Sequence, residues 1–113
     1  MQDNLYIYRA KITRIVDGDT IIADIDLGFS VILEKQIFRL SRINAPEMKE
    51  PTMLLALTSK DALSSKILGK DVVVKTKKDS HDKYGRYLAE IFLGEENIND
   101  WLLSEKYALP YKA

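Results

Sequence analysis

The sequence predicts an α+β protein built mainly of β-strands, with five strands and two helices in the order β-β-β-α-β-β-α. Three observations predict this fold class. Apolar and polar residues alternate over the first third of the chain, the period becomes helical between two breaker residues, and alternation then returns. With 113 residues, 46% of them hydrophobic and 30% charged, the chain fits one domain over residues 1–113 and is too short for two.

Three strands are expected in the N-terminal part. Residues 6–13 alternate between two sets of side chains, which is typical of a half-buried strand. The Asp-Gly pair at 17–18 predicts a tight turn into a second strand over 21–27, which Gly28 ends. A third strand is predicted over about 31–40, where β-branched and aromatic residues are frequent.

A helix is expected next. The Pro-Thr pair at 51–52 is typical of a helix start, and Gly69 of a C-terminal cap. Between them Ala56, Leu63 and Ile67 share one face at helical spacing. This face predicts the side of the helix that packs on the sheet.

Strand patterns then return. The remaining elements are a strand over 72–74, a polar loop over 77–86, a strand over 87–93 and a short helix over 98–106, which Asn97 caps and after which Pro110 ends regular structure. Five short strands with a helix between the third and fourth, and a short C-terminal helix, predict a β-barrel of the oligonucleotide-binding (OB) type. The fold alone does not predict an activity.

The composition limits the possible chemistry. The chain has no cysteine and one histidine, which excludes disulfides, thiolate zinc sites and multi-histidine metal sites. Any metal is therefore expected on oxygen ligands, which favours calcium or magnesium. The 17 basic and 17 acidic residues cancel, which argues against a protein that coats nucleic acid but allows an enzyme that grips a few phosphates.

The sequence was also compared with the patterns of membrane spans and secretory leaders. No apolar run reaches the roughly 18 residues that predict a membrane span. The first residues lack the basic and apolar regions of a secretory leader. We therefore expect no membrane partner, and either a cytoplasmic location or release from a trimmed precursor.

Four polar residues stand out at predicted strand ends and turns: Asp19, Arg39, Glu47 and Arg86. Phosphodiester hydrolysis needs such groups, because carboxylates bind a hard cation or activate water and arginines neutralise charge on phosphate oxygens. Taken singly, each has a plainer interpretation: a hairpin turn, an exposed strand residue, a surface carboxylate and a charged loop. Lysines at 70, 75, 77, 78 and 83 bias one region toward positive charge, but aspartates lie among them.

In order along the chain, five motifs together resemble the staphylococcal nuclease (thermonuclease) family. They are Val16-Asp17-Gly18-Asp19-Thr20, Phe38-Arg39-Leu40, Ile43-Asn44-Ala45-Pro46-Glu47, Asp82-Lys83-Tyr84-Gly85-Arg86 and Ile98-Asn99. The resemblance covers nearly the whole chain. It implies an OB-type barrel and a calcium-dependent nuclease that hydrolyses phosphodiester bonds of DNA and RNA, single strands preferentially, with a monomer as the default state.

The resemblance also implies a role for individual residues. The implied calcium ligands are Asp19, Asn44 and the backbone carbonyl of Ala45; the implied catalytic residues are Arg39, Glu47 as general base, and Arg86; the implied substrate contacts are Lys83, Tyr84 and Tyr111.

Two departures from the family pattern affect these expectations. The family has an aspartate where this chain has Asn44, so one negative charge is missing and we expect weaker calcium binding. The family also continues into a third helix beyond the position of Ala113. The alternative is a non-catalytic OB module with a weakened metal site that binds nucleic acid or a protein.

Overall fold

The computed structural model describes residues 6–78 and 85–111. The elements are β1 (Ile7–Asp17), β2 (Thr20–Asp26), β3 (Ile32–Leu40), β4 (Ile43–Asn44), α1 (Met53–Ile67), β5 (Asp71–Lys78), β6 (Tyr87–Leu93), β7 (Glu96–Asn97), α2 (Ile98–Ser104) and β8 (Leu109–Pro110).

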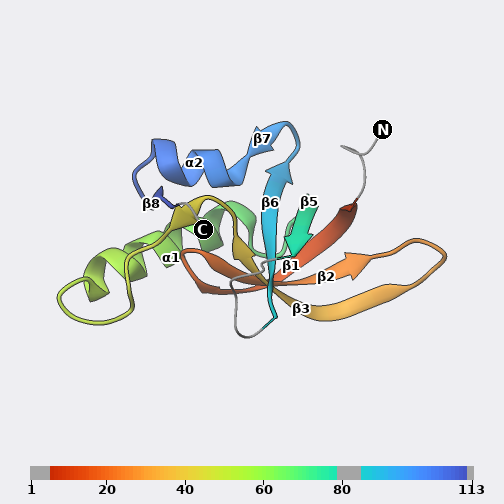
Figure 1. Cartoon of the computed structure of the whole chain (residues 1–113), viewed down its shortest axis with the longest axis horizontal. Coiled ribbons are helices and arrows are strands. Elements are labelled where there is room, and N and C mark those ends of the chain that lie inside the picture. Colours follow the sequence, from red (N-terminus) through yellow and green to blue (C-terminus); the bar gives the residue numbers. More distant parts are fainter. Residues whose placement is uncertain (1–5, 79–84, 112–113) are drawn as a thin grey trace.

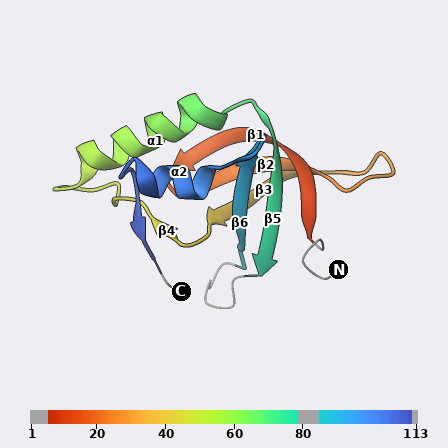
Figure 2. The same ribbon diagram turned by 90° about the horizontal axis from the view of Figure 1, so that it is seen from above.

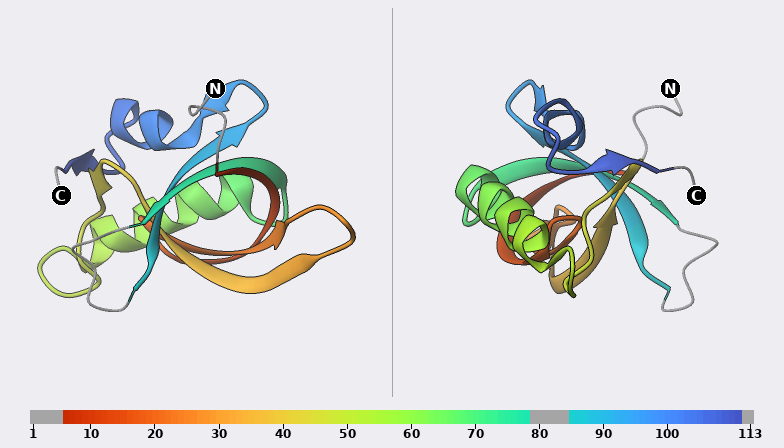
Figure 3. Two further views of the ribbon diagram at one scale, coloured as in Figure 1. Left: turned by 45° about the vertical axis from the view of Figure 1, so that its right-hand side comes forward. Right: turned by 90° about the vertical axis from the view of Figure 1, so that its left-hand side faces the viewer.

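Strands β1, β2, β3, β5 and β6 form the predicted five-stranded barrel. The hydrogen-bonded order is β3-β2-β1-β5-β6-β7, and a pairing of β3 with β6 closes it. That closing pair is parallel, whereas the other pairs between neighbouring barrel strands are antiparallel. The hairpin of β2 and β3 extends away from both helices (Figures 1 and 2). Figure 3 shows α1 and α2 lying against the outside of the barrel.

The predicted alternation positions the core, with two irregularities in the pairing of β1 with β2, of which the first changes the buried positions. The pairing of β1 with β2 shifts register between Ile12 and Arg14. Ile12 and Ile15 are therefore both buried although they lie three residues apart, and Arg14 is exposed. Such a bulge adds twist, which helps a strand to curve around a small barrel.

Helix α1 covers one end of the barrel with the predicted face. Ala56, Leu63 and Ile67 are all buried, and Ser59 joins them on the same side. Gly69 follows the helix with a φ of 75°, a left-handed conformation that glycine adopts without steric cost. The predicted cap position is therefore confirmed.

The C-terminal part differs from the prediction in several places: α2 ends at Ser104 rather than at residue 106, and the short strand β7 precedes it. The fourth predicted strand is longer, Asp71–Lys78, because β5 pairs with both β1 and β6. Pro110 does not end regular structure but lies in β8, opposite Ile43 of β4. This edge position tolerates proline, because there the missing N–H does not interrupt a ladder. The predicted cap of α2 is confirmed, since the Asp100 N–H donates to Asn97 Oδ1 over 3.0 Å.

A buried asparagine in α2 ties this helix to the barrel. Asn99 is 0% exposed. Its Nδ2 donates to the carbonyls of Ser41 (3.0 Å) and Ala89 (2.9 Å), and its Oδ1 accepts from the Ile91 N–H (3.0 Å). One side chain thus fixes the turn after β3 and two positions of β6. Over the described ranges, no helix has the length and apolar character that crossing a membrane requires.

Candidate active site

The site is built where β2 begins and β3 ends. Thr20 at the start of β2 pairs with Arg39 in β3, so Asp19 lies next to the end of that strand. The Leu40 N–H donates to the Asp19 carbonyl over 2.8 Å and fixes this contact. A short turn then leads into β4, which carries Asn44. Three segments of the sequence motifs therefore meet at one place.

The Asp19 carboxylate is held by its neighbours. Its Oδ2 accepts from the Ala45 N–H (2.9 Å), and its Oδ1 accepts from the Thr20 hydroxyl (3.2 Å). The Asp19 N–H in turn donates to Asp17 Oδ1 over 3.0 Å. Two of the predicted metal-site residues, Asp19 and Ala45, are thus in direct contact. Asp17 and Thr20 belong to the same motif, but their spacing alone did not assign them a part in the site.

The surroundings of Asp19 favour its protonated form. Burial raises the pKa of Asp19 to about 6, and the neighbouring Asp17 carboxylate contributes to this rise. The Ala45 N–H and the Arg39 guanidinium act in the opposite direction. A cation beside Asp19 would offset the cost of burying its charge.

We expect the metal-free protein to become more stable as the pH falls from about 7 to about 4. In this window folded Asp19 binds a proton that the unfolded chain does not yet bind, since its pKa is about 6 when folded and 3.8 for an unperturbed aspartate. Urea unfolding of the wild type and Asp19→Asn across this range checks it. The variant should be more stable than the wild type near pH 7, and the gap should close toward pH 4. A constant gap would contradict the raised pKa.

Arg39 is oriented on three sides. Its Nη2 donates to the Ile43 carbonyl and to Asn44 Oδ1, both over 3.2 Å. Its guanidinium carbon lies 4.8 Å from the centre of the Tyr111 ring, which is a cation–π contact. The predicted residues Arg39, Asn44 and Tyr111 are therefore brought together. The Tyr111 N–H donates to the Arg42 carbonyl over 2.8 Å, which holds the ring there.

Gly18 is a site-forming residue that the sequence did not predict. A Cβ added at this position would lie 2.8 Å from the Cβ of Ala45 and 2.9 Å from the Cβ of Ser59. Ser59 is fixed in turn, because its hydroxyl donates to the Tyr107 carbonyl over 2.6 Å. Only glycine allows the 17–20 turn to pack this closely between Ala45 and α1. The Asp-Gly pattern indicated a turn but not this contact.

Glu47 lies on the exposed loop between β4 and α1. Its Oε2 forms an ion pair with the Lys49 ammonium over 2.9 Å. Its carbonyl accepts from the Thr52 hydroxyl (2.7 Å) and the Lys49 N–H (2.8 Å), so the loop backbone is ordered. Within residues 6–78 and 85–111, no hydrogen bond or ion pair connects the Glu47 carboxylate to Asp19 or Arg39.

Arg86 directly precedes β6, the strand that closes the barrel. In the parallel pairing of β3 with β6, Phe38 lies opposite Tyr87 and Arg39 opposite Leu88. The backbone of Arg86 therefore enters the strand that adjoins the one carrying Arg39. Two predicted substrate contacts, Lys83 and Tyr84, lie outside the described residues.

The predicted calcium ligands are oxygen donors of the kinds that suit a hard cation. They are a carboxylate, the Asn44 side-chain amide and the Ala45 carbonyl, all of which calcium accepts. No three acidic or histidine side chains gather in the described part of the chain. A cation here would therefore depend on amide, carbonyl and water oxygens beside one carboxylate.

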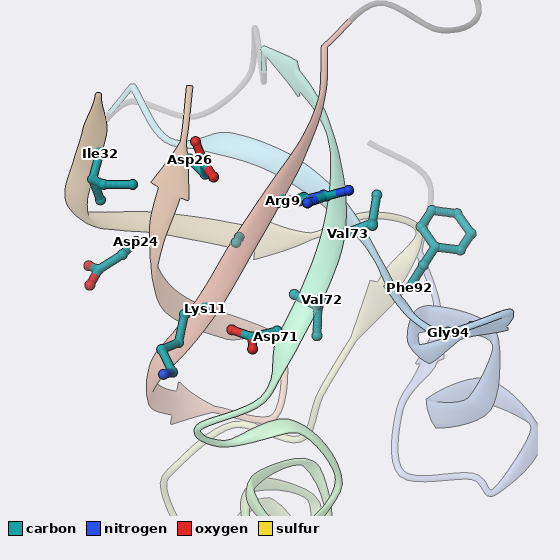
Figure 4. A pocket seen from close by; sticks show the side chains of 11 residues that line it. Arg9, Lys11, Asp24, Asp26, Ile32, Asp71, Val72, Val73, Phe92 and Gly94 are labelled. Carbon is teal, nitrogen blue, oxygen red and sulfur yellow. The ribbon is translucent and has the colours of Figure 1, made fainter. Parts of the chain in front are cut away.

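A larger cavity lies elsewhere on the barrel. It has a volume of about 630 Å³ and opens on the outer face of β1, β2 and β5 (Figure 4). Its charged lining carries both signs: Arg9 and Lys11 are basic, and Asp24, Asp26 and Asp71 are acidic. Because its carboxylates would repel phosphate, this cavity does not suit a polyanion.

Known proteins resemble this chain in sequence. A family model described as "Staphylococcal nuclease homologue" matches residues 37–113. A thermonuclease of Staphylococcus hyicus is 33% identical over 101 residues, which cover 87% of this chain and 56% of that protein. A thermonuclease of Staphylococcus intermedius is 32% identical over 100 residues, covering 86% and 56% respectively. The chain thus spans little more than half the length of these two relatives.

Proposed function

Because the chain belongs to the family of staphylococcal nuclease homologues, we propose that it is a calcium-dependent nuclease that hydrolyses phosphodiester bonds of DNA and RNA. Single strands are the preferred substrate. One observation carries the proposal: the half-buried Asp19 carboxylate lies next to the end of the strand that carries the oriented Arg39, and residues 44–45 contact both, through the Ala45 N–H on Asp19 and the Asn44 Oδ1 on Arg39. The names of the two relatives, both thermonucleases, support it.

The arginines are proposed to bind the phosphate. The hydrogen bonds that Arg39 makes to described residues all leave from Nη2, so Nε and Nη1 keep their N–H groups for phosphate oxygens. The Nε–H and Nη1–H groups lie on different edges of the planar guanidinium, so each would donate to a separate phosphate oxygen. Arg86, directly before the adjoining strand, would stabilise the charge that develops on the same group.

The two carboxylates have different proposed roles, metal binding for Asp19 and proton transfer for Glu47. Asp19, Asn44 and the Ala45 carbonyl would hold calcium, and the bound ion would polarise a phosphate oxygen as a Lewis acid. The Glu47 carboxylate would take the proton of the attacking water. It must first leave Lys49, and its exposed position on the loop allows that rotation. Catalytic contacts are often looser before substrate binds, so its separation from Asp19 does not oppose the role.

The test is cleavage of a fluorescently labelled single-stranded DNA with calcium, with chelator, and with Glu47→Gln. We expect cleavage that requires calcium, and a rate about a hundredfold lower for Glu47→Gln, because general base catalysis contributes roughly 10²–10⁴-fold. Lys49→Gln is the control, since it removes the Glu47 partner without removing the base. Oligonucleotide binding without cleavage at millimolar calcium would overturn the proposal.

The alternative function is a non-catalytic module that binds nucleic acid or a protein. One observation favours it: the Asn44 side-chain oxygen carries no full charge and already accepts from Arg39. Calcium must compete with that hydrogen bond. Binding without cleavage in the same experiment would select this alternative.

A further inference from the structure

Two adjoining hollows form a groove at the open end of the barrel, where β1, β5 and β6 meet the β2–β3 hairpin. Their volumes are about 350 Å³ and 270 Å³. Both are lined by Tyr6, Thr76 and Tyr87, so they form one continuous surface. We call it the mouth groove. None of the residues to which the site was assigned above lines it.

The mouth groove presents aromatic rings to solvent. Tyr6, in the turn directly before β1, is 64% exposed, and Tyr87, the first residue of β6, is 45% exposed. Tyr8 and Phe38 line the deeper part. The Tyr6 carbonyl accepts from the Thr76 N–H over 2.9 Å, which ties that residue to β5. Tyr87 is therefore carried by a paired strand, and Tyr6 by a turn whose backbone is hydrogen-bonded to β5.

The charge of the groove is positive. Lys77 and Lys78 line its first hollow, and both are exposed. In the part of the chain that the structure describes, neither lysine forms an ion pair, and no carboxylate lines either hollow. The groove thus differs from the cavity of Figure 4, where three aspartates offset the cations. Interleaved lysines and exposed rings are the combination that binds single-stranded nucleic acid.

The groove also adjoins the candidate active site. Tyr87 directly follows Arg86, and it pairs with Phe38, which directly precedes Arg39. Phe38 and Arg39 point to opposite faces of β3, so a nucleic-acid strand bound at the site would pass around the edge of the β3–β6 pair to reach the groove.

We propose that the mouth groove binds the nucleotides on one side of the cleaved bond, with bases stacked on Tyr6 and Tyr87 and phosphates near Lys77 and Lys78. The proposal rests on the proposed function for the class of substrate. It extends that function, because it predicts that strand length and base stacking contribute to affinity beyond the scissile phosphate.

The experiment measures binding by fluorescence anisotropy, in chelator so that nothing is cleaved. One probe is a labelled ten-nucleotide thymidine strand, and the other has the same backbone without bases. The double variant Tyr6→Leu, Tyr87→Leu should bind the thymidine strand at least about tenfold more weakly, since each stacked base contributes a factor of roughly 5 to 150. Its affinity for the abasic strand should not change. Phe29→Leu, at the hairpin tip outside the groove, is the aromatic control.

The lysines make a separate contribution. Lys77→Gln, Lys78→Gln should weaken both probes equally and lower the salt dependence, because phosphate contacts release counterions regardless of the base. An equal loss on both probes for the tyrosine variant, or no loss at all, would overturn the stacking. Circular dichroism melting separates either result from misfolding.

Cleavage is assayed apart from binding, with calcium and a nitrophenyl ester of a single thymidine phosphate, which is too short to reach the groove. If this ester is cleaved but the tyrosine variant binds like wild type, the proposal for the mouth groove is wrong and the nuclease proposal stands. If the tyrosine variant loses binding but neither DNA nor the ester is cleaved, the groove stands and the nuclease proposal is wrong.

Discussion

Arg39→Ala is expected to lower calcium-dependent cleavage of single-stranded DNA about a hundred- to a thousandfold, the usual loss when one oriented donor to a developing charge is removed. Arg39 is already oriented before substrate binds, by Ile43, Asn44 and Tyr111. The loss should therefore fall mainly on kcat. The same donors contact the phosphate in the bound substrate and in the transition state, but the negative charge on the phosphate is larger in the transition state, so the interaction is stronger there.

Two further variants make this result specific. Arg39→Lys keeps the charge but not the planar pair of donors, so it should recover only a small part of the rate. Arg14→Ala removes an exposed arginine of β1 and should leave cleavage within a few-fold of wild type. If Arg39→Ala also stays within a few-fold, Arg39 has no role in the reaction.

Asn99→Ala is expected to lower the free energy of unfolding by about 3–5 kcal/mol. The change leaves the Ile91 N–H and the Ser41 and Ala89 carbonyls without the Asn99 hydrogen bonds, and each buried group left unsatisfied costs roughly 1–3 kcal/mol. Asn99 is fully buried, so water cannot replace its side chain without opening the packing between α2 and the barrel.

Urea denaturation of the metal-free protein measures this loss. Asn97→Ala is the matched control, because it removes an asparagine two residues away that caps α2 and should cost about 1 kcal/mol. Equal effects of the two substitutions would show that the buried network contributes no more than a helix cap.

The barrel could be predicted from the sequence because its pattern is local. Alternation in β2 and helical spacing in α1 each follow from which side chains a single element buries. The predictions were wrong where the extent of a strand depends on the strands that pair with it. The length of β5 depends on having two neighbours, and the strand at Pro110 exists only because β4 lies beside it.

The same distinction applies to the site. The motifs indicated Asp19, Arg39 and Asn44, and the structure brings these three residues together. Gly18 and Ser59 could not be assigned from the sequence, because their contribution is a contact between a turn and a helix far apart along the chain. Nor could spacing predict that the Glu47 carboxylate pairs with Lys49 on an exposed loop.

The parallel pairing of β3 with β6 has a consequence for folding kinetics. Arg39 and Arg86 belong to segments that are distant in the chain, and these segments adjoin only when this pair forms. Non-local pairs form slowly, because the loss of chain entropy comes before the contacts that compensate it. A folding intermediate that holds only the β1-β2-β3 meander has one arginine of the two. Recovery of cleavage during refolding would then follow barrel closure rather than the earlier growth of secondary structure.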